Sequence, residues 1–93
     1  MLESEIENKL KKEIETLGGL SLKFTSPGMA GVPDRLVLLP KGKICFVEVK
    51  APGKSLRPLQ LKRKEQLENL GFKVYLIDSY ERLREVLDEI YTT

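Results

Sequence analysis

The chain has 93 residues, of which 41% are hydrophobic and 32% charged, and its formal net charge is +2. This balance excludes a disordered chain and predicts one small globular domain spanning residues 1–93. The sequence contains one cysteine and no histidine, which excludes internal disulfides, zinc fingers and catalysis by histidine and indicates an intracellular protein. It also contains no apolar run long enough to cross a membrane.

Hydrophobic periodicity and turn residues predict seven elements. Helices are indicated where apolar residues recur every three or four positions, and strands where apolar and polar residues alternate or where short apolar runs occur. In chain order they are a helix over 2–17, strands over 20–25, 35–39 and 44–49, a helix over 55–70 capped by Ser55, a strand over 73–78 and a last helix capped by Ser79. The predicted order is α-β-β-β-α-β-α, an α/β fold with a mixed four-stranded sheet flanked by helices.

The predicted helix over 55–70 has a less regular apolar stripe than the first helix. We expect this stripe to consist of Leu56, Leu59, Leu67 and Leu70.

The short connection over residues 40–42 predicts the register of a hairpin. Pro40 suits the first turn position and Gly42 the left-handed one, so a three-residue loop is expected. Leu39 would then face Lys43, and the same register would place Asp34 opposite Glu48. Two carboxylates so close repel one another unless a cation lies between them, and a hard divalent metal would meet that need. A slip of one residue would move Asp34 to the other face.

The strand over 44–49 has apolar residues on both faces, which is typical of a central buried strand. One face carries Glu48 and Lys50 after two apolar residues, and the other carries Cys45, Val47 and Val49. From the residues alone, Glu48 and Lys50 could equally form an exposed strand end, and Asp34 could equally be a turn residue.

Charge is segregated along the chain. Residues 41–64 hold eight basic residues and one acidic residue, a net charge of +7, whereas residues 1–16 and 78–93 carry −2 and −3. A basic segment of this size suggests a polyanionic partner such as nucleic acid, although scattered solvated lysines would also explain it.

Three motifs in this order resemble the VRR-NUC family of the PD-(D/E)XK, restriction endonuclease-like nucleases. They are Gly31-Val32-Pro33-Asp34, Phe46-Val47-Glu48-Val49-Lys50-Ala51-Pro52-Gly53 and Leu59-Gln60. The resemblance extends over most of the chain and is to the stand-alone form of phages and bacteria. It implies a restriction endonuclease-like core and a location in the cytoplasm of a bacterial or phage-infected cell.

The resemblance also implies the roles of individual residues. Asp34, Glu48 and the backbone carbonyl of Val49 would bind Mg²⁺ or Mn²⁺. Lys50 would orient the attacking water and offset charge in the transition state. Gln60 matches a family glutamine near the start of the following helix, although without the resemblance it would be a surface residue.

A glutamate on the first helix would complete the metal site in this family. At 100° per residue, Glu3 lies about 40° and Glu7 about 80° from the centre of the apolar stripe, whereas Glu5 lies on the far side. Either Glu3 or Glu7 is therefore a candidate ligand. Without the resemblance, both would be surface residues that compensate the helix dipole.

The resemblance implies an endonuclease that cuts branched DNA, including Holliday junctions. Two symmetric cuts by a chain with one site require a homodimer, for which the last helix with Tyr80 and Tyr91 could supply an interface. Alternatives are a nuclease for flaps or single-strand/duplex junctions, and a non-catalytic DNA-binding module.

The residues expected to hold flanking phosphates are Lys41, Lys43, Lys54, Arg57, Lys62 and Arg63. Arg63 lies on the apolar side of its helix, so its side chain could instead extend along that surface.

Overall fold

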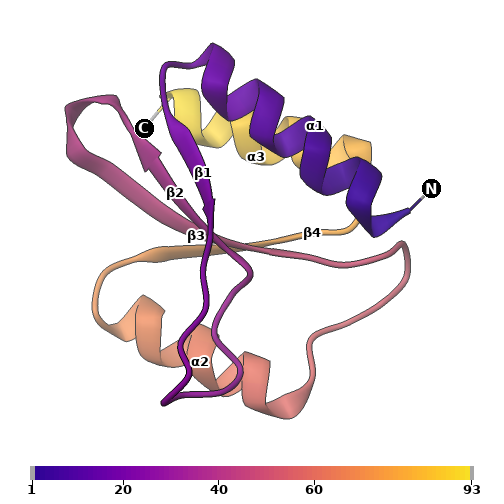
Figure 1. The fold of residues 1–93 in the computed structure, drawn as a ribbon, viewed down its shortest axis with the longest axis vertical. Coiled ribbons are helices and arrows are strands. Elements are labelled where there is room, and N and C mark those ends of the chain that lie inside the picture. The colour runs from indigo at the N-terminus through magenta and orange to yellow at the C-terminus, as the bar shows by residue number, and fades with distance from the viewer. Residues whose placement is uncertain (1, 93) are drawn as a thin grey trace.

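The computed structural model describes residues 2–92, which form three helices, four strands and a short 3₁₀ helix (Figure 1). The predicted α/β class and element order are confirmed. The elements are α1 (Glu3–Thr16), β1 (Leu20–Lys23), β2 (Arg35–Leu39), the 3₁₀ helix (Pro40–Gly42), β3 (Lys43–Val49), α2 (Pro58–Asn69), β4 (Lys73–Ile77) and α3 (Tyr80–Thr92). None of these helices is both long and apolar enough to span a membrane.

The four strands form one mixed sheet in the order β1-β2-β3-β4. The pairs β1–β2 and β2–β3 are antiparallel, and β3–β4 is parallel because α2 connects these two strands as a crossover. Helices α1 and α3 cover one face of the sheet, and α2 lies on the other (Figure 1). Strand β3 is therefore flanked on both sides, as its two apolar faces predict.

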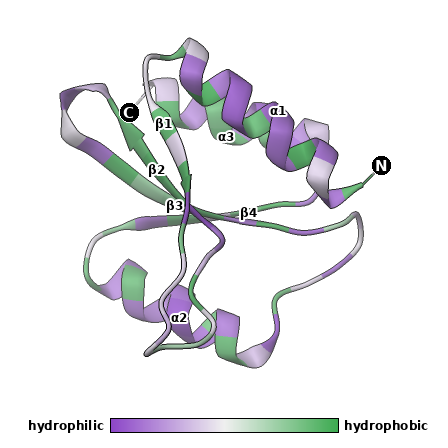
Figure 2. Ribbon diagram, in the orientation of Figure 1, coloured by the Kyte–Doolittle hydropathy of each residue, from purple (hydrophilic) through white to green (hydrophobic). Residues whose placement is uncertain are grey.

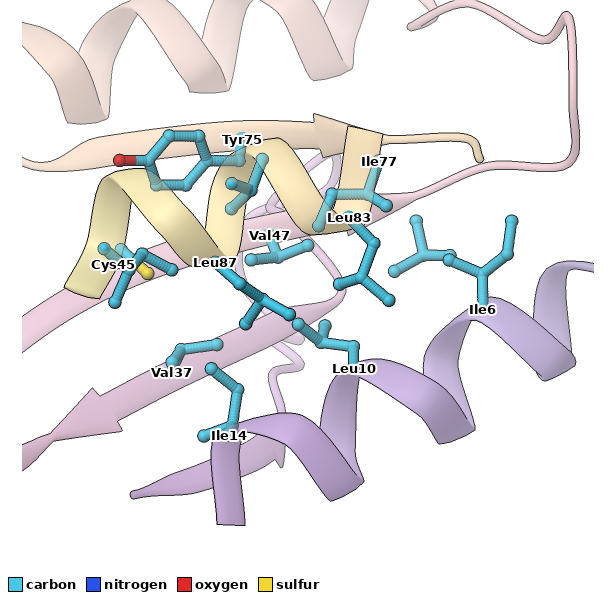
Figure 3. Close-up of a cluster of buried hydrophobic side chains, with 13 residues drawn as sticks. Ile6, Leu10, Ile14, Val37, Cys45, Val47, Tyr75, Ile77, Leu83 and Leu87 are labelled. Atoms are coloured by element: carbon cyan, nitrogen blue, oxygen red, sulfur yellow. The ribbon is translucent and has the colours of Figure 1, made fainter. Parts of the chain in front are cut away.

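The main hydrophobic core lies between the sheet and the pair α1 and α3 (Figure 3). Alternation along β3 directs Val47 and Val49 into this core, where both are completely buried. The apolar stripe of α1 meets them from the opposite side. The buried cluster consists of Ile6, Leu10, Ile14, Val37, Cys45, Val47, Val49, Tyr75, Ile77, Leu83, Val86, Leu87 and Ile90.

The sheet face that packs against α2 is less fully covered than the face beneath α1 and α3. Among the residues of α2, all of which the structure describes, only Gln60 is buried. Leu59 is 41% exposed and Leu70 is 74% exposed, so the predicted apolar stripe is wrong for these two residues. Figure 2 shows hydrophilic residues interrupting the hydrophobic ones along α2. The helix therefore depends on a few specific contacts rather than on a continuous apolar seam.

The start of α2 also differs from the prediction. The helix begins at Pro58 with Arg57 as its N-cap residue, so Ser55 lies before the helix and does not cap it. The physical reason is that the Gln60 side chain accepts the Arg57 backbone N–H at 2.9 Å, which supplies the cap from within the first turn. For α3 the prediction is confirmed, since the Ser79 hydroxyl accepts the Arg82 N–H at 3.0 Å.

Candidate active site

Asp34 and Glu48 lie side by side at the end of the sheet away from the hairpin turn, Asp34 just before β2 and Glu48 on β3. Strands β2 and β3 pair with Leu39 opposite Lys43 and Arg35 opposite Val47, which is the predicted register. Asp34 directly precedes β2, and the register continued by one residue places it opposite Glu48. The Val49 backbone N–H donates to Asp34 Oδ2 at 3.2 Å, and the Phe24 N–H donates to the Asp34 carbonyl at 2.7 Å. Asp34 is thus fastened to both neighbouring strands.

The turn that sets this register has two residues in the left-handed region, one more than expected. Gly42 takes the predicted left-handed conformation with φ +74°, and Lys41 adopts φ +68° as well. A non-glycine residue in this region is uncommon, and nothing in the Pro40-Lys41-Gly42 sequence marks it in advance.

Glu48 is a buried carboxylate, with 5% of the residue exposed. Its Oε2 atom accepts a hydrogen bond from Gln60 Nε2 at 3.1 Å and lies 3.7 Å from Lys50 Nζ. Burial raises the pKa of Glu48 to about 7, and the charge of Asp34 acts in the same direction, while Lys50 opposes the shift. The ionised form of Glu48 is therefore disfavoured in the protein alone.

Gln60 connects the carboxylate to α2. Its Oε1 accepts the Arg57 N–H at 2.9 Å, so its Nε2 amide group is left to donate to Glu48 Oε2 at 3.1 Å. The same side chain therefore caps the helix and fixes the Glu48 carboxylate. Gln60 is the glutamine that the family resemblance singled out near the start of this helix, and it is buried rather than on the surface.

Lys50 follows β3 on the same face as Glu48. Its backbone N–H donates to the Ile77 carbonyl at 3.0 Å, which extends the pairing with β4 beyond the last strand residue. Its side chain is 16% exposed, so the ammonium group borders the carboxylates and remains accessible from one side. The arrangement brings two acidic groups and one cation together at one end of the sheet.

This donor set fits a hard divalent cation. Oxygen ligands suit Mg²⁺ and Mn²⁺, and Mg²⁺ is commonly held by one or two carboxylates together with waters and substrate phosphates. A cation between Asp34 and Glu48 would also relieve the repulsion that raises the pKa of Glu48. The residues present are thus compatible with metal binding at this end of the sheet.

The sequence matches the VRR-NUC domain over residues 3–81. The chain belongs to the VRR-NUC family. It is therefore a nuclease domain. A protein of Acyrthosiphon pisum secondary endosymbiont phage 1, named "Putative nuclease p44", is 51% identical over 79 residues, which is 85% of each chain. A solved VRR-NUC domain superposes with a TM-score of 0.88 at 34% identity, covering 92% of this chain and 94% of that one.

The first-helix glutamates of this VRR-NUC domain lie apart from the two carboxylates. Glu7 Oε2 is 3.5 Å from the Arg35 guanidinium, and Arg35 points to the α1 face of the sheet because it follows Asp34 by one residue. Glu3 is exposed at the start of α1. Within residues 2–92, no group of three or more acidic, cysteine or histidine side chains is close enough to hold a metal.

The predicted phosphate-binding residues fall into separate places. Lys54, Arg57 and Lys62 are exposed on α2 and the segment before it. Lys41 and Lys43 are exposed at the hairpin, so the length of β3 separates Lys43 from Glu48 by roughly 17 Å at 3.3 Å per residue. These two lysines could reach only distant phosphates. Arg63 donates from Nε to the Ala30 carbonyl at 2.8 Å.

Two features near the site were missed by the sequence analysis. Arg35 is 8% exposed and holds Glu7, and a charged residue opening a strand gives no sign of such burial. Phe24 and Phe72 pack on Phe46 with ring centroids 5.6 and 5.7 Å away. Phe46 shares its strand face with Glu48, so the alternation of β3 could have indicated an apolar neighbour for the carboxylate.

Proposed function

We propose that this nuclease domain is a metal-dependent endonuclease that hydrolyses phosphodiester bonds in branched DNA, including Holliday junctions, as a homodimer. The observation that carries the proposal is the pairing of Asp34 with a buried Glu48 beside the Lys50 ammonium group. A protein that only bound DNA would gain nothing from two adjacent carboxylates facing a phosphate backbone.

The carboxylates of Asp34 and Glu48 and the carbonyl of Val49 would hold Mg²⁺ or Mn²⁺. When bound, such an ion supplies Lewis acidity and lowers the pKa of coordinated water. Gln60 keeps the Glu48 oxygen oriented through its 3.1 Å hydrogen bond. Either first-helix glutamate would have to move to join these ligands, and Glu7 would have to leave Arg35.

Lys50 would act directly on the reacting groups. Its ammonium group has three donors, one of which is near Glu48 Oε2. The remaining donors can hold the attacking water and stabilise negative charge that develops on the phosphate oxygens. No covalent intermediate is required, which agrees with a site that has no histidine.

Binding of DNA is proposed to depend on the exposed basic residues Lys54, Arg57 and Lys62 near the site. Phosphate contacts of this kind give affinity that falls with salt and is mostly independent of sequence. Lys41 and Lys43 would contact a more distant part of a branched substrate. Selection of a branched structure would then come from the arrangement of phosphates rather than from base contacts.

Cleavage of labelled DNA tests the proposal. The purified protein should cut four-way junctions with Mn²⁺ present and should not cut them with a chelator. Asp34→Asn and Lys50→Ala should each lower the rate at least about 100-fold, because each removes a group that acts in the transition state. Glu65→Gln removes an exposed carboxylate of α2 and should leave the rate unchanged.

The substrates distinguish the alternatives. Cutting of flaps or single-strand/duplex junctions without cutting of four-way junctions would replace the proposed substrate by the alternative one. Tight binding of all these DNAs with no cleavage at any metal concentration would support a non-catalytic binding module and contradict the enzyme.

A further inference from the structure

The loop between β1 and β2 (residues 24–34) is fastened to α2 at two adjacent points. The first is the hydrogen bond of 2.8 Å from Arg63 Nε to the Ala30 carbonyl. The same guanidinium donates from its Nη1 to Gln66 Oε1 at 2.9 Å, which orients it along the helix. Arg63 is partly buried, unlike its exposed neighbour Lys62.

The second point is a close approach of Gly31 to Leu59. Gly31 has φ +89°, and a Cβ atom at this position would lie 2.8 Å from Leu59 Cγ and 3.0 Å from the Leu59 carbonyl oxygen. Both the conformation and the space therefore require glycine. Leu59 and Arg63 are four residues apart, so they lie one turn from each other on the same side of α2.

The contacts of Arg63 and Leu59 with the loop restrict the position of Asp34, the second carboxylate of the site. Asp34 follows Gly31 by three residues through Val32 and the buried Pro33, so little freedom remains between the fastened loop and the carboxylate. On the other side, Gln60 of the same helix holds Glu48. One turn of α2 therefore fixes both acidic residues, each through a different contact.

We propose that Arg63 is a positioning residue that keeps Asp34 opposite Glu48 by holding the 24–34 loop against α2, and that it does not contact phosphate. Two of the nitrogen atoms of its guanidinium already donate to Ala30 and Gln66. The placement of Asp34 is independent of the proposed function, whereas the statement about phosphate rests on it.

The amide of Val49 reports on this placement because it donates to Asp34 Oδ2. In ¹H–¹⁵N NMR spectra, Asp34→Ala defines the Val49 shift when the carboxylate is absent. Arg63→Gln should move the Val49 signal toward that position, and Arg63→Lys should move it less, because a lysine can still donate to Ala30. The matched control Lys62→Gln should leave the signal in place. An unchanged Val49 signal in Arg63→Gln would overturn the proposal.

A second variant keeps Arg63 intact. Gly31→Ala should force the loop away from Leu59 and move the Val49 signal in the same direction. A Val49 signal at the wild-type position in this folded variant would contradict the role of the loop contact.

The salt dependence of DNA binding tests the second half of the proposal. Lys62→Gln should make the negative slope of log K for DNA binding against log salt concentration shallower by about 0.9, the effect of one lost phosphate contact. Arg63→Gln should leave this slope unchanged, and a loss of about 0.9 would show a phosphate contact and overturn the assignment. Absence of DNA binding by the wild-type protein would instead contradict the proposed function, and the Val49 signals would still decide the positioning role.

Discussion

Glu48 is a carboxylate whose environment opposes its ionised form. Burial and the charge of Asp34 raise its pKa from an ordinary value of 4.5 to about 7, although the charge of Lys50 acts in the opposite direction. Between these two pH values the folded protein keeps a proton that the unfolded chain has released. This contribution to stability is complete below about pH 4.5 and is lost as the pH rises through about 7.

Replacement of Glu48 by glutamine tests this relation between the pKa of Glu48 and the stability of the protein. With a chelator present at pH 8, Glu48→Gln should raise the free energy of unfolding by on the order of 1–3 kcal/mol, because no buried charge has to be kept. The gain should vanish at pH 4. Urea titrations at both pH values measure it, with Glu65→Gln as the exposed control. A loss of stability at pH 8 would contradict the assigned cause of the pKa shift.

At the scale of elements, the two helix starts differ in what stabilises them. The Ser79 hydroxyl caps α3, whereas Ser55 lies outside α2. Ser79→Ala should therefore lower the free energy of unfolding by about 1 kcal/mol, the usual cost of a lost cap. The matched change Ser55→Ala should have an effect within about 0.5 kcal/mol. Equal losses in thermal or urea unfolding would show that Ser55 has a role at the start of α2.

The elements that could be predicted are those defined by local signals. The hairpin register follows from a three-residue turn between two apolar strands, and it already places Asp34 opposite Glu48. The boundaries of α2 could not be obtained in this way, because its first turn is capped by Gln60, a residue that also bonds to another strand. Sequence periodicity likewise overestimated the burial of Leu59 and Leu70, since α2 covers only part of the sheet.

Contacts between distant parts of the chain were the least predictable. The pairing of Glu7 with Arg35 joins α1 to β2, and the contact of Arg63 with Ala30 joins α2 to a loop 33 residues earlier. Neither has a sequence pattern of its own, because each depends on how the layers stack. The family resemblance indicated a metal ligand on α1, and only the geometry shows that Glu7, one of the two candidates, pairs with Arg35.

At the scale of the whole molecule, the chain measures 32 × 31 × 21 Å. This is close to one turn of a DNA duplex, about 34 Å, so a single copy can contact only a limited part of a four-way junction. Two symmetric cuts therefore require two copies, as the proposed homodimer supplies. Tyr91 of α3 is 75% exposed beside a shallow cavity of about 220 Å³ bordered by Leu17, Pro40 and Ile90.

We expect Tyr91 to contribute to the dimer interface. Tyr91→Glu should shift the mass measured by sedimentation from dimer to monomer, because a charge would replace an aromatic contact. Tyr91→Phe should retain the dimer. A dimer mass for all three proteins would place the interface elsewhere, and a monomeric wild-type protein that makes paired cuts would contradict the homodimer.

The binding of Mn²⁺ tests the central claim most directly, and calorimetric titration measures it without any substrate. The wild-type protein should bind Mn²⁺ at pH 7 and release protons as it does so, because burial raises the pKa of Glu48 and its carboxyl must ionise to bind. Asp34→Asn should lose at least about 10-fold in affinity, and Glu65→Gln should bind like the wild type. The account would be contradicted if the wild-type protein bound no Mn²⁺, or if it bound Mn²⁺ no more tightly than Asp34→Asn does.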